Sequence, residues 1–155
     1  MDYRNAARCF GVLHRRSQAY IVQACEKLQL TFSEYILLLK LYENEGISQE
    51  DMASFMYVDK AAVARIIKSL EVRGFVHRVQ GKQDKRVKRI YTTVFAREQE
   101  GFLQEVLDCW ITYLSGGVEN ELIDGLLKGF QELAQRAGDA DLQKIISEKD
   151  GRAFT

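Results

Sequence analysis

The sequence predicts a mostly helical fold with one small β-hairpin, and three observations support this class. The 155 residues include no proline, which suits long helices joined by short connections. Apolar residues recur at helical spacing along most of the chain, and the period changes to that of strands only between residues 75 and 93. Hydrophobic residues make up 46% of the chain, enough for a sizeable core, which argues against a largely disordered protein.

The N-terminal third predicts three helices in succession. Apolar spacing indicates a first helix over residues 6–28. Thr31 and Glu34 then form a capping-box pattern that opens a second helix, which Gly46 is expected to end. Ser48 stands at another cap-like start and introduces a short helix that reaches residue 56.

Asp59 is well placed as the N-cap of a fourth helix. Apolar residues follow it at the i, i+3, i+4, i+7 spacing of a half-buried helix, namely Val63, Ile66, Ile67 and Leu70. Gly74 is expected to end this helix. Its opposite face carries Lys60, Ala61, Ala64, Arg65 and Lys68.

Two β-branched and aromatic segments follow, and they predict strands over residues 75–80 and 87–93. The charged segment 81–86 between them is the predicted hairpin tip. Helical spacing then returns in apolar stripes at 102–114 and 122–133, separated by a glycine pair. The tail after Gly138 is expected to be polar with a short apolar patch.

Charge is concentrated in one segment although the whole chain has a net charge of zero. Residues 60–90 contain ten basic and two acidic residues, so this segment carries +8 and the remainder −8. A basic segment in an otherwise acidic protein is typical of a polyanion-binding surface, although a solvated basic face is the alternative.

Two short helices, a tight turn and a following hairpin together predict a winged helix-turn-helix. On the fourth helix, Arg65 is suited to bidentate contacts with guanine, while Lys60 and Lys68 are suited to phosphates. The hairpin tip brings Lys82, Lys85 and Arg86 towards the adjacent minor groove or backbone. Strand alternation lets only one of Lys88 and Arg89 face DNA, and Lys88 is favoured. For Arg73 and Arg78, structural and phosphate-facing roles both remain open.

Several motifs in this order resemble the MarR family of transcriptional regulators. The stretch from Asp59 to Arg78 resembles that family's recognition helix and first wing strand, with Leu70, Glu71 and Gly74 at the family's spacing. Asp84-Lys-Arg86 matches the family's Asp-x-Arg wing motif, and 30–35 resembles the entry to its second helix. The resemblance covers roughly residues 8–135.

The resemblance implies a homodimer with three regions in each chain. Residues 1–30 would form an N-terminal dimerisation helix, 31–93 the DNA-binding lobe, and 94–155 the C-terminal dimerisation helices and tail. The family's minor-groove arginine corresponds to Arg86, and Asp84 would hold the wing tip. Ala61 and Ala64 stand on the DNA-facing helix where many members carry Ser and Thr, and Thr92 and Ala96 replace a usual Leu and Gly.

Two sensing mechanisms are possible within this family. His14, Arg15 and Tyr35 are candidates for a pocket that binds a small-molecule effector, although a solvent-facing or salt-bridged group and a core tyrosine are the alternatives. Some members sense peroxides through a thiol on the first helix, and Cys9 stands near that position. A buried, inert cysteine is the alternative. Cys25 is expected on the same helix as Cys9, about 24 Å away, and Cys25 and Cys109 are expected in a core or interface.

Other classes of protein receive little support from the sequence. It has no phosphate loop, dinucleotide-binding glycine motif or nucleophile elbow, so no enzyme and no cofactor are predicted. The two histidines and three cysteines do not have metal-ligand spacing, so no metal site is predicted. No apolar run is long enough to cross a membrane, and no signal peptide is evident, so we expect a cytoplasmic protein.

Together these features predict a homodimeric regulator that binds double-stranded DNA at a pseudo-palindromic operator. Repression is the expected sign of regulation, with release by a small-molecule effector. The alternatives are a winged-helix module that binds another protein and a thiol-based redox regulator that uses Cys9.

Overall fold

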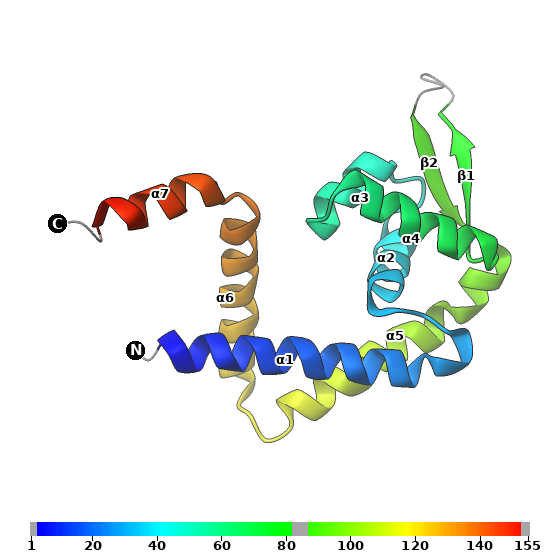
Figure 1. The fold of residues 1–155 in the computed structure, drawn as a ribbon. Coiled ribbons are helices and arrows are strands. Elements are labelled where there is room, and N and C mark those ends of the chain that lie inside the picture. Colours follow the sequence, from blue (N-terminus) through cyan, green and yellow to red (C-terminus); the bar gives the residue numbers. More distant parts are fainter. Residues whose placement is uncertain (1–2, 82–86, 153–155) are drawn as a thin grey trace. The chain divides into compact units, whose positions relative to one another are not determined.

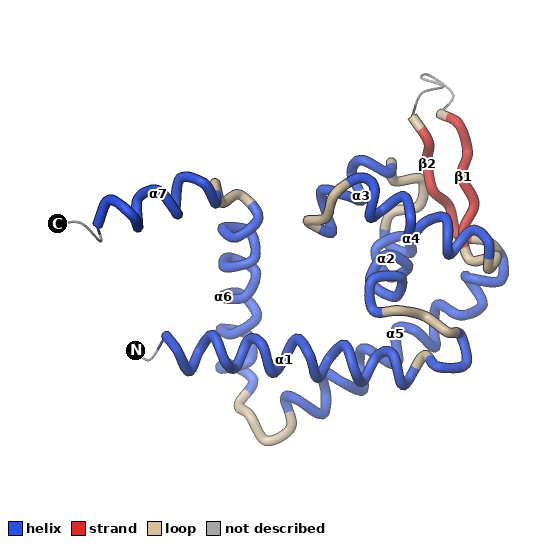
Figure 2. The backbone as a smooth tube through the Cα atoms, viewed as in Figure 1, coloured by secondary structure: helices blue, strands red, loops and turns tan. Residues whose placement is uncertain are grey.

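The chain is helical apart from one two-stranded hairpin (Figures 1 and 2). The structure, a computed structural model, describes residues 3–81 and 87–152. Its elements in chain order are α1 (Tyr3–Ala24), the 3-10 turn η1 (Glu26–Leu28), α2 (Phe32–Glu43), α3 (Gln49–Met56), α4 (Lys60–Val72), β1 (Val76–Gln80), β2 (Lys88–Thr92), α5 (Val94–Ser115), α6 (Asn120–Gly138) and α7 (Leu142–Arg152). The predicted class, mostly helical with a single small hairpin, is confirmed.

The chain divides into two compact units, Met1–Leu114 and Ser115–Thr155. The first unit holds both strands and the helices from α1 to almost the end of α5. The second holds α6, which is strongly amphipathic and buries none of its side chains, and α7. The C-terminal tail was expected to be polar with a short apolar patch, and no helix was predicted in it; the structure forms the helix α7 there. Among the described residues, no helix is both long and apolar enough to cross a membrane.

The first helix differs from its expected span. It ends at Ala24, and Cys25 begins the separate turn η1, so the expected single helix over 6–28 and the placement of Cys25 on it are wrong. The chain departs from the α-helix there because the next amides bond three residues back instead of four, which tightens the turn. Near its C-terminal end α1 contacts α5, where the Trp110 indole donates to the Ser17 hydroxyl at 2.8 Å and stacks on the Tyr20 ring.

The predicted starts of α2 and α3 are confirmed. Thr31 and Glu34 form a complete capping box, with the Thr31 amide donating to the Glu34 carboxylate at 2.8 Å and the Glu34 amide to the Thr31 hydroxyl at 3.3 Å. The Ser48 hydroxyl accepts from the Asp51 amide at 3.0 Å. Each of these bonds satisfies an amide that the first helical turn leaves without a backbone partner.

Gly46 has a different role from the expected helix terminator. The second helix already ends at Glu43, with Asn44 as its C-cap. Gly46 lies in the following loop at φ +79°, and its amide donates to the Ile90 carbonyl at 2.9 Å. A Cβ at this position would lie 2.8 Å from the Tyr91 hydroxyl, so the residue is glycine because the loop passes directly against β2. Gly74, at φ +75° just after the C-cap of α4, ends its helix as predicted.

The two strands pair antiparallel, with Val76 opposite Thr92 and Gln80 opposite Lys88. Each strand is slightly shorter than the sequence indicated. An isolated bridge between Ser48 and Arg89 joins the start of β2 to the segment before α3, so the hairpin is fixed to the helix-turn-helix along this strand.

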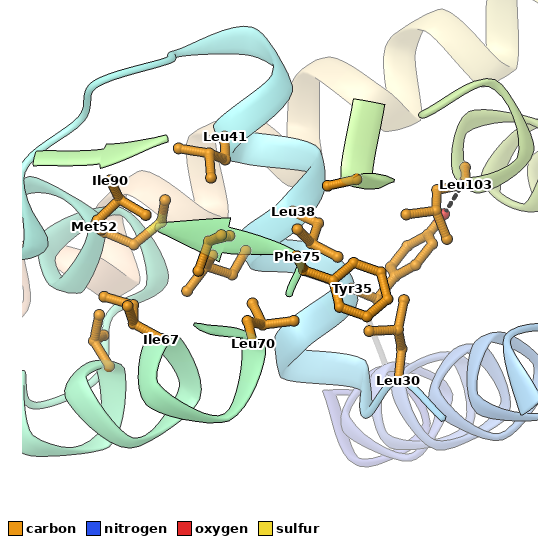
Figure 3. Packing of buried hydrophobic residues seen from close by; sticks show 14 of the residues in the cluster. Leu30, Tyr35, Leu38, Leu41, Met52, Ile67, Leu70, Phe75, Ile90 and Leu103 are labelled. Carbon is orange, nitrogen blue, oxygen red and sulfur yellow. Dashed lines mark hydrogen bonds between the residues drawn. The ribbon is translucent and has the colours of Figure 1, made fainter. Parts of the chain in front are cut away.

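One hydrophobic cluster joins α2, α3, α4, both strands and α5 around a central α2 (Figure 3). On α2, Tyr35 and Leu38 are fully buried. Leu37 and Leu41 are fully buried as well, so α2 is covered on more sides than a single stripe would require.

Two tyrosine hydroxyls of α2 donate to backbone carbonyls of α5. Tyr35 donates to Leu103 at 2.8 Å, drawn as a dashed line in Figure 3, and Tyr42 donates to Ala96 at 2.7 Å. Burial raises the pKa of both hydroxyls well above the ordinary tyrosine value, so both remain protonated donors. These bonds fix the first half of α5 against the centre of the core.

Candidate nucleic-acid interface

The fourth helix presents one apolar and one basic face. Its inner residues Val63, Ile67 and Leu70 are fully buried, which fixes its rotation about its own axis. Its outer face carries the predicted DNA-contacting residues: Lys60, Ala61, Arg65 and Lys68 are exposed and Ala64 is half-buried. The two alanines keep part of this face narrow, so the long basic side chains project beyond it.

The start of α4 is capped as predicted. Asp59 is in an extended conformation, and its carboxylate accepts from the Ala62 amide at 2.8 Å. The cap satisfies one free amide and places a negative charge at the positive end of the helix dipole. It therefore determines where the exposed end of α4 begins.

The exposed cations on α4 differ in their partners. Lys60 forms an ion pair with Glu50 of α3, in which both side chains remain about two-thirds exposed (68% and 70%). An exposed ion pair such as Lys60–Glu50 contributes little to stability. For Arg65 and Lys68, the structure shows no ion pair or hydrogen bond with any described residue. All three cations are therefore positioned to exchange water or a weak partner for phosphate.

Arg73, the C-cap of α4, is structural. Its guanidinium donates to the Gln29 carbonyl at 2.7 Å and forms an ion pair with Glu34, whose side chain is only 5% exposed. Burial alone would raise the pKa of Glu34, but hydrogen bonds from Thr31, Ser69 and Arg73 together lower it. The residue that caps α2 thus also holds the end of α4, and the phosphate-facing alternative for Arg73 is not favoured.

Arg78 on β1 is also engaged within the fold. Two of its guanidinium nitrogens donate to the two carboxylate oxygens of Glu71, a bidentate pair between α4 and the wing. The hydrogen bond from Arg78 is the main cause of the lowered pKa of Glu71. This pair sets the angle between α4 and β1 and leaves Arg78 little freedom to contact a phosphate.

The two basic residues that begin β2 point in different directions. The Arg89 guanidinium donates to the Gly46 carbonyl at 2.8 Å, so it is occupied against the protein. Lys88 is exposed and lines a shallow hollow together with Lys60, Ser48 and Glu50. This arrangement agrees with the preference for Lys88 over Arg89 as the DNA-facing residue, which stays a prediction.

Comparisons with known proteins give the family. Residues 30–88, which include α2 to the start of β2, match the MarR family model. The HTH-type transcriptional regulator TtmR of Methylorubrum extorquens is 30% identical over 144 residues, an alignment that covers 88% of this chain and 68% of TtmR. This chain belongs to the MarR family.

Other relatives are similar over part or all of the fold. The HTH-type regulator YybA of Bacillus subtilis is 41% identical over 66 residues, which span 43% of this chain and 44% of YybA. The transcriptional regulator SlyA has a crystal structure with 26% identity and a TM-score of 0.82, covering 86% of this chain and 94% of SlyA. A MarR-family structure from Listeria monocytogenes in complex with a 26mer DNA reaches a TM-score of 0.82 at 22% identity, covering 86% and 89% of the two chains. The winged helix-turn-helix fold is thereby confirmed.

The wing tip of this MarR-family chain lies outside the described residues. The predicted roles of Lys82, Lys85 and Arg86 as DNA contacts, and of Asp84 as the residue that holds the tip, therefore remain predictions. The hairpin is described up to Gly81, whose amide donates to the Val87 carbonyl at 2.8 Å.

Of the two positions where this chain departs from the MarR pattern, Thr92 makes a contact through its side chain that fixes the end of β2. The Thr92 hydroxyl and amide donate to the carboxylate of Glu45, in the loop after α2. Thr92 is fully buried, so a leucine there would remove the hydroxyl donor and leave this carboxylate only the backbone amide and the more distant Arg97. Ala96 supplies the carbonyl that accepts from Tyr42. This bond uses the backbone of Ala96, within α5, so a glycine at this position would accept it equally.

The three candidate effector residues do not form one site. Tyr35 is fully buried and hydrogen-bonded to Leu103, so its predicted place in an effector pocket is wrong because the ring fills the core. His14 and Arg15 are both exposed on α1, and the His14 ring packs edge-on against Phe32 at 5.9 Å between centroids.

The cysteines are all free thiols. Cys25 is fully buried, and burial raises the pKa of its thiol, as is typical of an inert core cysteine. Cys9 and Cys109 are exposed in the single chain. Within the described part of the chain, no group of three or more His, Cys, Asp or Glu side chains could hold a metal ion.

Three acidic partners were not apparent from the sequence. Glu34, Glu50 and Glu71 each bind a cation of the basic segment, from 39, 10 and 7 positions away in the chain. Only the Glu71–Arg78 pair could have been predicted from the sequence. A residue near the end of a helix comes close to one on the following strand when a single glycine turn joins the two elements.

Proposed function

We propose that this protein binds double-stranded DNA in a sequence-specific manner, with α4 in the major groove and the wing beside it. The observation that supports this most is the division of the basic residues. Arg65 and Lys68 are exposed on the outer face of α4, whereas Arg73 and Arg78 are held by carboxylates at its far end. Charge available for DNA is thereby concentrated on one face of a rigidly capped helix.

Each exposed residue has a chemical role in this proposal. Arg65 has the planar, forked donors that match the O6 and N7 acceptors of guanine. Lys60 and Lys68 neutralise phosphates on either side of the groove. Ala61 and Ala64 supply apolar contacts, which suit the methyl group of thymine.

A binding selection tests the proposal. Purified protein is mixed with genomic fragments at near-physiological salt, and the selection is repeated with Arg65→Ala. Enrichment of a two-fold symmetric site that Arg65→Ala loses would support the proposal. Arg97→Ala is the matched control, because it removes an exposed arginine of α5 whose closest acidic partner, Glu45, is 3.7 Å away. No enrichment with the wild-type protein, or equal enrichment with Arg65→Ala, would contradict it.

The same reasoning extends to a homodimer on a pseudo-palindromic operator, with 31–93 as the DNA-binding lobe and 1–30 and 94–155 as dimerisation regions. On α6, four leucines lie largely exposed along one stripe: Leu122, Leu126, Leu127 and Leu133. A single amphipathic helix that buries none of its residues needs a partner surface. We propose that a second copy of this chain supplies it.

Sedimentation equilibrium tests the dimer. Leu126→Glu and Leu127→Glu place charge in the stripe, and we expect them to shift the mass towards the monomer. Gln131→Glu adds the same charge on the polar part of α6 and should leave the mass unchanged. A wild-type monomer at micromolar concentration would refute the dimer.

Repression and release by a small-molecule effector complete the proposal and come from the family resemblance. A reporter gene placed behind the selected operator tests the sign, since expression should rise when the protein is deleted. Screening anionic and aromatic compounds for loss of operator binding tests release.

A further inference from the structure

The turn between α3 and α4 contains a tyrosine in an unfavourable backbone conformation. Tyr57 has φ +51° and ψ +41°, in the left-handed region. Its amide donates to the carbonyls of Ala53 and Ser54, and the next amide also donates to Ala53. These bonds end α3 and fix Tyr57 in this conformation, which glycine adopts without cost and other L-residues adopt at about 1–2 kcal/mol.

Nothing described in the chain compensates for a tyrosine at this position. The side chain is 63% exposed, and no hydrogen bond or ring contact joins it to a described residue. Glycine or asparagine would satisfy the same turn more cheaply. Strained conformations of this kind cluster at binding and other functional sites.

Tyr57 lies next to the start of α4, the helix proposed to enter the groove. It lines a surface hollow together with Asp59 and Lys60, the residues that begin α4. Glu50 lines the same hollow and holds the Lys60 ammonium in an ion pair. Two carboxylates therefore lie beside this part of the proposed DNA surface. A further cation here would be drawn to these acids, whereas a neutral hydroxyl can still donate outward.

We propose that the Tyr57 hydroxyl donates a hydrogen bond to a DNA phosphate next to the groove that α4 enters. The inference rests on the proposed DNA binding and adds a positioning contact to it. A tyrosine hydroxyl is an uncharged phosphate donor, so it orients the protein on the duplex without reading base sequence. With Tyr57 before α4 and Lys68 near its end, phosphate contacts bracket Arg65 and set its depth in the groove.

The test compares two substitutions with a control at the same backbone conformation. Tyr57→Phe removes only the hydroxyl, and Tyr57→Asn removes the ring while suiting the left-handed turn. Gln29→Asn is the matched control, because Gln29 has the same φ of +51° in the turn between η1 and α2. Binding is measured by fluorescence anisotropy on a labelled duplex that carries the selected operator, over a range of salt concentrations.

We expect both Tyr57 variants to bind roughly ten- to a hundredfold more weakly than the wild type, which is the size of one hydrogen bond to a charged group. The slope of log affinity against log salt should stay the same, since tyrosine neutralises no phosphate, whereas Lys60→Ala should flatten it by about 0.9 per protomer. Thermal stability should not fall in Tyr57→Asn, and Gln29→Asn should bind like the wild type.

Two results would overturn the proposal. One is wild-type affinity in Tyr57→Phe, and the other is an equal loss in Gln29→Asn, which would trace the effect to the backbone alone. Failure of the wild-type protein to bind any duplex would contradict DNA binding itself, and this outcome is seen before any Tyr57 variant is measured.

Discussion

The cap of α4 links the stability of the fold to the proposed DNA surface, and its two contributions can be separated. Asp59→Ala removes the acceptor that the Ala62 amide reaches at 2.8 Å. Loss of such a cap costs about 1 kcal/mol, within a range of about 0.5–2. For a chain of this size that loss lowers the midpoint of thermal unfolding by about 2–4 °C. Asp59→Asn keeps an acceptor, and asparagine is nearly as good an N-cap as aspartate.

The two variants should therefore differ in their midpoints of thermal unfolding, and Asp59→Asn shows the effect of the charge on DNA affinity alone. Asp59→Asn keeps the midpoint close to wild type and binds DNA more tightly, because it removes a negative charge from the DNA-facing end of α4. Asp59→Ala lowers the midpoint. Thermal unfolding at one fixed protein concentration measures the first effect, since the midpoint of the proposed dimer would depend on concentration. Fluorescence anisotropy on the operator duplex measures the second.

A control makes the comparison specific. Asp139→Ala makes the same change at the C-cap of α6, where the structure assigns the aspartate side chain no capping bond. Its midpoint should not fall, because a negative charge is unfavourable at a helix C-terminus. The reasoning is refuted if Asp59→Ala unfolds at the wild-type temperature or if Asp59→Asn is destabilised equally.

Three further outcomes are expected. Glu50→Gln frees the Lys60 ammonium, so operator affinity measured by anisotropy should rise at low salt while thermal stability hardly changes; a loss of affinity would show that the ion pair positions Lys60 for binding. Glu34 and Glu71 both have lowered pKa values in the fold, so their stabilisation is present at neutral pH and declines as the pH falls below about 5. Urea unfolding across that range should show a decline that Glu→Gln variants flatten, and an equally steep decline in those variants would exclude these carboxylates as its cause. Ile67→Ala leaves a cavity beneath α4 and should cost about 2–5 kcal/mol in urea unfolding; a cost below 1 would mean that this face is not packed as described.

Local signals predicted most of the fold. Thr31, Ser48 and Asp59 cap the helices that their spacing indicated, because an N-cap depends on residues within one turn. The hairpin was visible from its β-branched and aromatic composition. The sequence did not predict that α1 ends at Ala24, because no proline marks that point. It also did not predict the helix that begins at Leu142, because no strong apolar stripe runs along it.

The candidate site was predictable only in part. The basic segment and its helix could be read from the sequence, but the sequence does not distinguish Arg65 from Arg73. That difference depends on Glu34 and on the Gln29 carbonyl, which the fold brings to the end of α4 from the start of α2. The left-handed conformation of Tyr57 was also not predicted, because it depends on the hydrogen bonds that end α3.

The two tyrosine bonds between α2 and α5 restrict how this regulator can move. A helix carbonyl that accepts a side-chain hydroxyl cannot slide past it without losing that bond, and Tyr35 and Tyr42 hold two such points, at Leu103 and Ala96. The segment of α5 from Ala96 to Leu103 is thus fixed to α2 within the core. In the proposed homodimer, a change in the separation of the two recognition helices that keeps both bonds leaves α5 free to bend only beyond Leu103. Compounds or substitutions that stiffen α5 past that point should lock the operator affinity in one state.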